Sequence, residues 1–534
     1  MKTQLLYSLI LLTSICTLNA QISLVKDINM GSGDSNPNQL FSFKDKLYFT
    51  ASSASGFDLY TSDGTESGTE VKVNFSSGYF NGFSLPIIFN NEMYFKAKAK
   101  DGGILIKTDG TNFSSVVQEI FPVFGADING FIVYKDELYF SASEAFTARQ
   151  RLYKTDGTAE GTLKVKDIES GSLTDVKYEK IVYNDMLYFT GKDADNGIEL
   201  WKSDGSEAGT TLVKDINPGT SSSTPYRFTI ANNILFFMAE TADNGRELWK
   251  TDGTEAGTVL VKDIRTGTSN SDPKEFTLYK NRLYFLANDG TRNKLWVTDG
   301  TENGTTLFKD IELNNTTFSS IVYKDQLFFA AKDGDFGFEL WTSDGTPEST
   351  TMLKDISPGD RNDNGNPNNF FIYKNELFFE AYTDELGDEL YKTDGTAEGT
   401  VLIADINTGR FNFAPQRFAI HNDILFFSGD GGDGGGSADV GRELFKYEDA
   451  TASTNSDFLE KVNIFADNDN TVHIKGLQTS KSTLRIVNLL GKEMKKVNFT
   501  SNGNASIKTN LISGVYILNI NTEKGNISKK ILIK

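Results

Sequence analysis

The chain has 534 residues but very few of the side chains that most metal and covalent chemistry needs. Its 1 Cys and 2 His argue against Cys-based catalysis, disulfide scaffolds, Cys/His zinc sites and most His-dependent triads. The formal net charge of −19 argues against nucleic-acid binding, because phosphate is recognised by a basic face. Beyond the N-terminus, no apolar run reaches the length that a membrane-spanning helix needs.

Turn-forming and aromatic residues are abundant instead. The chain contains 48 Gly, 40 Phe and 20 Tyr. Many turns combined with many aromatic side chains are typical of short β-strands, so the sequence predicts an all-β protein.

The N-terminus has the features of a secretory signal. Lys2 supplies a basic start, Leu5–Leu12 is apolar, and Ala20 is a small residue at the expected cleavage point. We expect residues 1–20 to be removed. The only cysteine, Cys16, lies within this segment, so the mature chain would be cysteine-free. A lipoprotein anchor is an alternative, but bulky Ile15 stands where a small residue would be expected.

The C-terminus differs in charge from the rest of the chain. Residues 456–534 contain 12 Lys and Arg against 6 Asp and Glu, whereas the central part is strongly acidic. This asymmetry predicts a domain boundary, with a polar linker at 450–456 and a C-terminal domain at 457–534. Strand patterns at 483–489, 515–520 and 527–533 favour a small antiparallel β-sandwich.

Three motifs of this tail resemble the C-terminal sorting domain of type IX secretion cargo. They are Ile486–Glu493, Leu511–Ile517 and Lys529–Lys534. The resemblance implies handling by the type IX secretion machinery and a secreted or outer-membrane-surface location, with the tail removed or used for attachment. An ordinary binding sandwich is the alternative. The motif residues assigned to sorting are Gly491, Gly514, Tyr516, Lys529 and Lys530.

The central part is a tandem repeat. Its clearest unit is Glu247–Thr258 followed by Val259–Ile264, and an Asp-Gly pair recurs every 45 to 50 residues. The aspartates of these pairs are Asp63, Asp109, Asp156, Asp204, Asp252, Asp299, Asp344 and Asp394. Regular strand-rich units of this length predict the blades of a β-propeller. In the sixth unit, four strands are expected at 276–279, 283–286, 294–297 and 306–309.

The repeat resembles that of the "ELWxxDGT" repeat proteins over residues 21–449. This resemblance supports a secreted or surface location and implies no settled activity. We expect each repeated Asp to accept hydrogen bonds from amides of its own loop. A bulky residue recurs at one position of the repeat, which we call the slot. All four tryptophans occupy this slot: Trp201, Trp249, Trp296 and Trp341. We expect this slot to pack blade against blade, with a sugar-binding aromatic row as the alternative.

The two ends of the array complement each other. The strand pattern at Leu24–Ile28 has no preceding third strand, and the last unit, after Leu444 and Phe445, has no fourth strand. We therefore expect the first strand to complete the last blade and close a ring of nine blades. An eight-bladed ring and an open array are alternatives.

Two sets of residues are candidate sites. Variable polar residues precede the apolar anchor of a recurrent Pro-x-x-Phe or Leu segment and suit a ligand-binding rim. They are Gln39, Arg227, Glu275, Asn369 and Arg417. A solvated rim that binds nothing is the alternative. Acidic hairpins offer carboxylate oxygens that can bind Ca²⁺, but none matches the twelve-residue calcium loop, and plain hairpin turns are the favoured interpretation. Their candidate ligands are Asp193, Asp195, Asp333 and Asp335.

No catalytic residue is expected. The chain has no phosphate-binding Gly loop before a helix and no nucleophile elbow, and His421 is interpreted as a surface residue. The sequence therefore predicts a non-catalytic binding or adhesion module whose partner is an extracellular glycan or a surface protein. Calcium is the one candidate cofactor. A polysaccharide-active enzyme with carboxylates at the channel mouth and a purely structural surface protein are the alternatives.

Overall fold

Two compact units make up the chain in the computed structural model, one at Leu24–Lys446 and one at Tyr447–Lys534 together with residues 1–23. The structure describes residues 21–75, 80–99, 102–116, 128–143, 150–170, 179–313, 318–334, 336–359, 363–432, 440–448, 463–466, 471–488, 493–509, 511, 514–522 and 525–533. Every regular element in these ranges is a β-strand, as predicted, and none of them holds a helix able to cross a membrane. The expected signal peptide, the linker 450–456, Asp335 and Gly491 lie outside the described residues.

The larger unit consists of nine repeats, whose strands pair antiparallel in chain order. Repeats one to four are β2 (Asn38–Phe43), β3 (Lys46–Ser53), β4 (Gly56–Ser62), β5 (Glu70–Val73); β6 (Phe80–Phe89), β7 (Glu92–Ala99), β8 (Gly102–Thr108), β9 (Phe113–Ser115); β10 (Ile128–Tyr134), β11 (Glu137–Ser143), β12 (Gln150–Thr155), β13 (Leu163–Ser170); and β14 (Lys180–Tyr183), β15 (Met186–Lys192), β16 (Ile198–Ser203), β17 (Thr211–Lys214).

Repeats five to nine follow the same order. They are β18 (Tyr226–Ala231), β19 (Ile234–Thr241), β20 (Gly245–Thr251), β21 (Val259–Lys262); β22 (Lys274–Tyr279), β23 (Arg282–Asn288), β24 (Asn293–Thr298), β25 (Thr306–Lys309); β27 (Ser320–Tyr323), β28 (Gln326–Lys332), β29 (Glu339–Ser343), β30 (Thr351–Lys354), with the short β26 (Glu312–Leu313) beside β28; β31 (Asn368–Tyr373), β32 (Glu376–Thr383), β33 (Gly387–Thr393), β34 (Val401–Ala404); and β35 (Gln416–His421), β36 (Ile424–Asp430), β37 (Arg442–Glu448).

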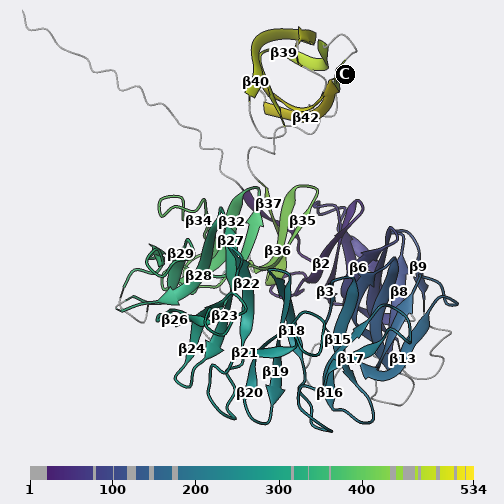
Figure 1. Ribbon diagram of the computed structural model, residues 1–534. Helices are drawn as coiled ribbons and strands as arrows, with labels where there is room; N and C mark the ends of the chain where they lie inside the picture. Colours follow the sequence, from purple (N-terminus) through teal and green to yellow (C-terminus); the bar gives the residue numbers. More distant parts are fainter. Residues whose placement is uncertain are drawn as a thin grey trace, which may run out of the picture. The chain divides into compact units, whose positions relative to one another are not determined.

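The ninth repeat takes its fourth strand from the other end of the chain. β1 (Gln21–Lys26) pairs with β37, as the complementary ends of the sequence predict. The first strands of successive repeats contact one another from β2 through β6, β10, β14, β18, β22, β27 and β31 to β35, and β35 contacts β2. Figure 1 shows the purple β2 beside the green β35, although they are far apart in the sequence.

Short turns hold the strands of each repeat in register. Lys280 and Asn281 join β22 to β23 with φ values of 45° and 59°, which is the left-handed pair of a type I′ hairpin. The Asp-Gly turn joins the third strand to the fourth, and Asp252 Oδ1 accepts hydrogen bonds from Thr254 N at 2.8 Å and Thr254 Oγ1 at 2.7 Å. The same acceptor role holds for the other seven predicted aspartates, so the predicted loop-amide bonding is confirmed.

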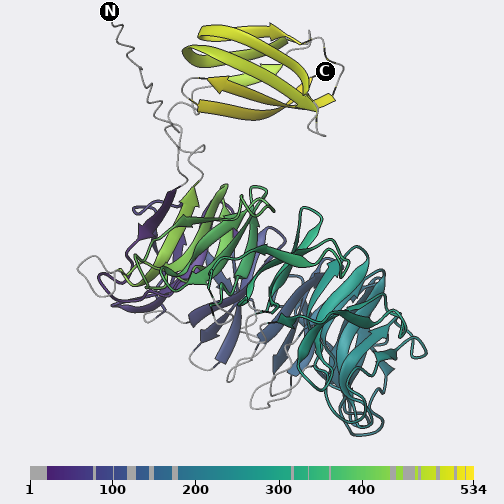
Figure 2. The ribbon, with the colours of Figure 1, turned by 90° about the vertical axis from the view of Figure 1, so that its left-hand side faces the viewer.

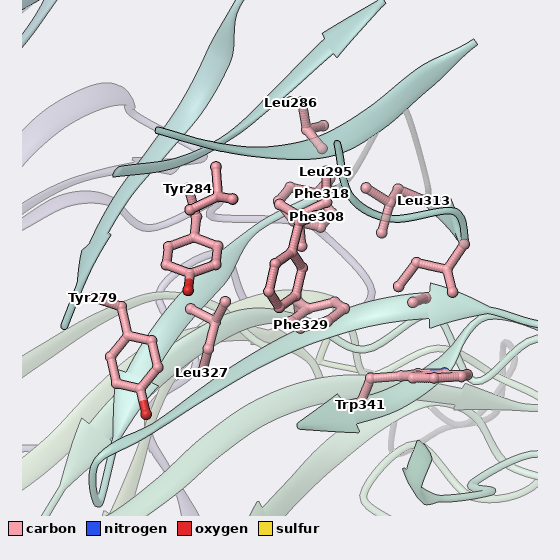
Figure 3. Close-up of a cluster of buried hydrophobic side chains, with 13 residues drawn as sticks. Tyr279, Tyr284, Leu286, Leu295, Phe308, Leu313, Phe318, Leu327, Phe329 and Trp341 are labelled. Atoms are coloured by element: carbon pink, nitrogen blue, oxygen red, sulfur yellow. The ribbon is translucent and has the colours of Figure 1, made fainter. Parts of the chain in front are cut away.

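Aromatic side chains fill the space between neighbouring sheets. Figure 3 shows Trp341 of the seventh repeat in one cluster with Tyr284 and Phe308 of the sixth. All four tryptophans are at most 9% exposed, so the recurrent slot packs repeat against repeat as predicted. This burial also removes the tryptophans from any surface that a sugar could reach.

Lysine and tyrosine side chains add hydrogen bonds between repeats. Lys262 Nζ donates to Thr305 O at 2.8 Å, and Tyr279 Oη donates to Asp325 O at 2.5 Å. At the junction of the chain ends, Lys26 Nζ donates to Thr69 O at 2.8 Å. The junction between the last and the first repeat is therefore built like the junctions inside the array.

The C-terminal unit is a single five-stranded antiparallel sheet (Figure 2). Its strands are β38 (Asn463–Ala466), β39 (Thr471–Asn488), β40 (Glu493–Lys508), β41 (Gly514–Thr522) and β42 (Gly525–Ile533). The long β39 has register shifts against β40 between Lys475 and Ser480, and it pairs with β38 before them and with β41 after them. One hydrophobic core gathers side chains from β38, β39, β40 and β41, and the antiparallel all-β character of the tail agrees with the prediction.

Candidate functional site

Nine structurally equivalent residues form the candidate site, each four positions before the last residue of a first strand. We call them the ring positions, because the first strands that carry or follow them contact one another in a cycle. They are Gln39, Leu85, Gly130, Glu179, Arg227, Glu275, Ser319, Asn369 and Arg417. All five residues predicted from the sequence as a binding rim occupy ring positions.

The backbone at most ring positions is left-handed. Arg227 and Arg417 have φ of 60° and Glu275 has φ of 55°, and the same sign holds at four further ring positions. The pairing of the first strand with the second shifts register at these residues, as between Lys274 and Thr277. A β-bulge of this kind turns one side chain out of the sheet. Left-handed non-glycine residues are costly and gather at functional sites, which supports a role for this ring.

Polar contacts anchor part of the ring. The backbone N of Arg227 donates to Glu179 Oε2 at 2.6 Å, which links two neighbouring ring positions. Asn369 Nδ2 donates to Glu380 Oε2 at 2.6 Å. The side chains of Gln39 and Glu275 are exposed. Acidic and basic members are balanced, so the ring has no strong charge of either sign.

The sequence interpretation missed the other four ring positions. Leu85, Gly130, Glu179 and Ser319 lack the Pro-x-x-Phe signature on which the prediction relied. A fixed offset of four residues from the end of each first strand would have identified them, because the strand pairing conserves this offset in every repeat.

Glu380 is a carboxyl that is hydrogen-bonded to a ring residue, Asn369, and has a perturbed pKa. Burial raises the pKa of Glu380 to about 7, and the nearby Asp388 charge adds to this effect. The hydrogen bond from Asn369 and the charge of Arg442 act in the opposite direction. Burial also raises the pKa of Asp388. A carboxyl with a pKa near neutrality, one hydrogen bond behind an exposed side chain, is a candidate for a functional group.

The glutamate of the Glu-Leu-Trp motif was not singled out from the sequence, yet it is fully buried. Glu247 Oε2 accepts from Ser271 Oγ at 2.5 Å and from Ile264 N at 3.1 Å. The equivalent Glu443 accepts from Ser35 Oγ and from the backbone N of Ile28. These carboxyls hold the loop into the next repeat and lie away from solvent, so their role is structural.

His421 corrects an expectation from the sequence. It was interpreted as a surface residue, but only 2% of it is exposed. His421 occupies the slot that tyrosine fills in other repeats, and its Nδ1 lies 2.9 Å from Ser42 Oγ of the first repeat. Burial lowers the pKa of His421 below 6.5. The surface interpretation failed because the first repeat of the chain lies against the last repeat and covers His421.

The acidic hairpins contain ordinary turn contacts. Asp193 Oδ1 accepts from the backbone N of Asp195 at 3.1 Å and of Asn196 at 2.7 Å, which is an Asx-type turn. Among the residues that the structure describes, no group of three or more His, Cys, Asp or Glu could hold a metal ion. Calcium binding at Asp193, Asp195 and Asp333 stays a prediction.

The sorting motif residues are placed on the last two strands. Gly514 begins β41, and Tyr516 on the same strand is 4% exposed. Lys529 pairs with Leu518 and Lys530 with Ile517 across β41 and β42. Residues 466–534 match the secretion system C-terminal sorting domain. This sorting domain implies handling by the type IX secretion machinery and export to the cell surface or beyond.

No curated protein matches the chain by sequence. Similar solved structures include a prolyl endopeptidase (15% identity, TM-score 0.36, 66% of this chain and 54% of that chain) and oligopeptidase B from Leishmania major (13%, 0.36, 66% and 53%). The extracellular domain of a putative one component system from B. thetaiotaomicron is also similar (10%, 0.24, 96% and 98%). The chain spans just over half the length of these peptidases.

Proposed function

We propose that residues 21–449 form a closed nine-bladed β-propeller that acts as a non-catalytic binding or adhesion module at the cell surface or outside the cell. The cyclic contacts of the first strands and the pairing of β1 with β37 support the closed ring. The sorting domain supports the location.

The observation that carries the binding role is the set of ring positions. Seven of the nine share a left-handed backbone, while their side chains range from Leu85 to Arg417. A constant scaffold that presents variable side chains is what a rigid binding surface requires. Buried hydrogen bonds between a glutamate and a loop serine, such as Glu443 with Ser35, fix the loops that lead to these positions.

The test uses the secreted full-length chain on a panel of polysaccharides and host-cell surfaces, with and without calcium. We expect saturable retention without released products, and we expect the Arg227→Ala and Arg417→Ala double variant to weaken retention. Glu66→Ala, an exposed turn residue outside the ring, is the control. Equal retention of the double variant and the control would remove the ring from the binding surface.

A polysaccharide-active enzyme is the second candidate, and Glu380 is the observation that favours it. Glu380 has a raised pKa, accepts a hydrogen bond from Asn369 and lies near a second carboxyl, that of Asp388. In the same assay, released oligosaccharides that disappear in Glu380→Gln would support this candidate over the binding module.

A further inference from the structure

A pocket opens between the first strands of the seventh and eighth repeats. Its volume is about 360 Å³, within the size range of small-molecule sites. Phe318, Ile321 and Phe370 supply its apolar lining, and serine and asparagine side chains supply the polar lining. Two ring positions, Ser319 and Asn369, border it. None of its lining residues is charged.

Ser319 places an unsatisfied hydroxyl at this pocket. Its Oγ is buried and has no hydrogen-bond partner among the described residues. A buried hydroxyl without a partner destabilises a protein and calls for an explanation, of which a bound ligand is one. Arginine occupies the equivalent ring position in two other repeats, at Arg227 and Arg417, so the small side chain of Ser319 leaves room here.

Two asparagine side chains line the pocket. Asn369 Nδ2 donates to Glu380 Oε2 at 2.6 Å, and Asn368 Nδ2 donates to Asn366 O at 3.0 Å. Each of these bonds uses one of the two N–H donors of the side-chain amide, so each amide retains a donor and an acceptor that can serve a ligand. Amide and hydroxyl groups without a charged lining residue favour a neutral ligand that carries hydroxyl groups, and the carboxyl of Glu380, which accepts from Asn369, disfavours an anion.

We propose that this pocket binds one neutral sugar residue of a glycan. The hydroxyls of the sugar would bond to Asn368, Asn369 and the hydroxyl of Ser319, and its C–H groups would contact the apolar lining. The inference rests on the proposed binding function and gives that function a ligand class and a position.

The experiment measures the affinity of the full-length chain for cellotriose, maltotriose and mannotriose, with trigalacturonate as the charged comparison. At least one neutral trisaccharide is expected to bind, and Ser319→Ala should weaken that binding about fivefold or more, as expected for one lost hydrogen bond. The same variant should raise the Tm by about 1–2 °C, because it removes an unsatisfied buried hydroxyl. Ser319→Arg, which copies the sister repeats, should abolish binding by filling the pocket.

Ser428→Ala is the matched control. The Ser428 Oγ is also buried and unpartnered within the described residues, but it lies in the ninth repeat, outside the pocket. Its removal should raise the Tm similarly and leave the affinity unchanged.

The outcomes separate the two proposals. Wild-type affinity in both Ser319 variants, or tighter binding of trigalacturonate, overturns the sugar pocket while retention on polysaccharides or cells still supports the binding module. Retention on cell surfaces without any affinity for the neutral trisaccharides also overturns the sugar pocket and still supports the binding module. A chain that is retained nowhere and binds no trisaccharide overturns both proposals.

Discussion

Ser35 donates its hydroxyl hydrogen to Glu443 Oε2 at 2.6 Å across 408 residues of chain. The backbone N atoms of Ile28 and Asn29 donate to the same carboxyl at 3.1 and 3.2 Å. Glu247 repeats the arrangement with Ser271 over 24 residues. One local motif therefore links neighbouring repeats along the chain and also links the last repeat to the segment that precedes the first.

Replacing Glu443 with alanine should lower the free energy of unfolding by about 3 kcal/mol, because three donors lose their buried acceptor. Urea unfolding of the full-length chain measures the loss. Glu247→Ala should cost at least as much, since Glu247 accepts from the equivalent three donors and also from the backbone N of Ser271. A loss for Glu443→Ala no larger than for the exposed Glu66→Ala would show that the chain ends are not held together by this contact.

The buried glutamates should make stability fall with rising pH. Burial raises the pKa of Glu247 and Glu443 to about 7 and that of Glu389 to about 8, above the ordinary value of 4.5. A raised folded pKa stabilises the fold fully below about pH 4.5, and this contribution is lost as pH rises through 7 to 8. We expect a loss of about 1 kcal/mol per glutamate between pH 5 and 8.

Urea midpoints at pH 5 and 8 test this dependence. Gln at positions 247, 389 and 443 should reduce it, because an amide does not ionise, and the part that remains belongs to other buried glutamates such as Glu380. An equally steep pH dependence in the triple Gln variant would assign the effect to other groups.

The glycine of the Asp-Gly-Thr-x-x-Gly turn should resist substitution by alanine. A Cβ at Gly257 would lie 2.1 Å from Asp252 Oδ1, so Gly257→Ala should cost about 2 kcal/mol. Ser349 holds this place in the seventh repeat and its Oγ donates to Asp344 Oδ1 at 2.5 Å, so Gly257→Ser should cost less. Adding Asp252→Ala should reduce the cost of Gly257→Ala in thermal unfolding, and purely additive losses would contradict the contact.

His421 should make the junction of the last and first repeats sensitive to acid. Its pKa is lowered by burial, so its contribution to stability is present above pH 6.5 and is lost as pH falls through the lowered folded value. His421→Tyr restores the residue that other repeats use, as Tyr373 does in donating to Asp423 O. We expect similar Tm values at pH 7 and a higher Tm for the variant at pH 5. A lower Tm for the variant at both pH values would indicate that tyrosine does not fit this junction.

Much of the fold followed from periodic local signals. The Asp-Gly turns, the four strands per repeat and the packing role of Trp249 were predicted because each depends on a few neighbouring residues repeated many times. The five predicted ring residues were found through a local Pro-x-x-Phe pattern. Ser319 and Glu179 were missed because they share the position without sharing that pattern.

The strand composition, the repeat length and the sorting domain can be predicted from the sequence, since each is encoded in short contiguous segments. The contacts between repeats depend on the tertiary structure. The tertiary structure makes Glu443 a buried acceptor for Ser35, encloses His421 against the first repeat, and leaves the hydroxyl of Ser319 without a hydrogen-bond partner among the described residues. Burial and its effect on charge depend on residues hundreds of positions away, and no local pattern carries that information.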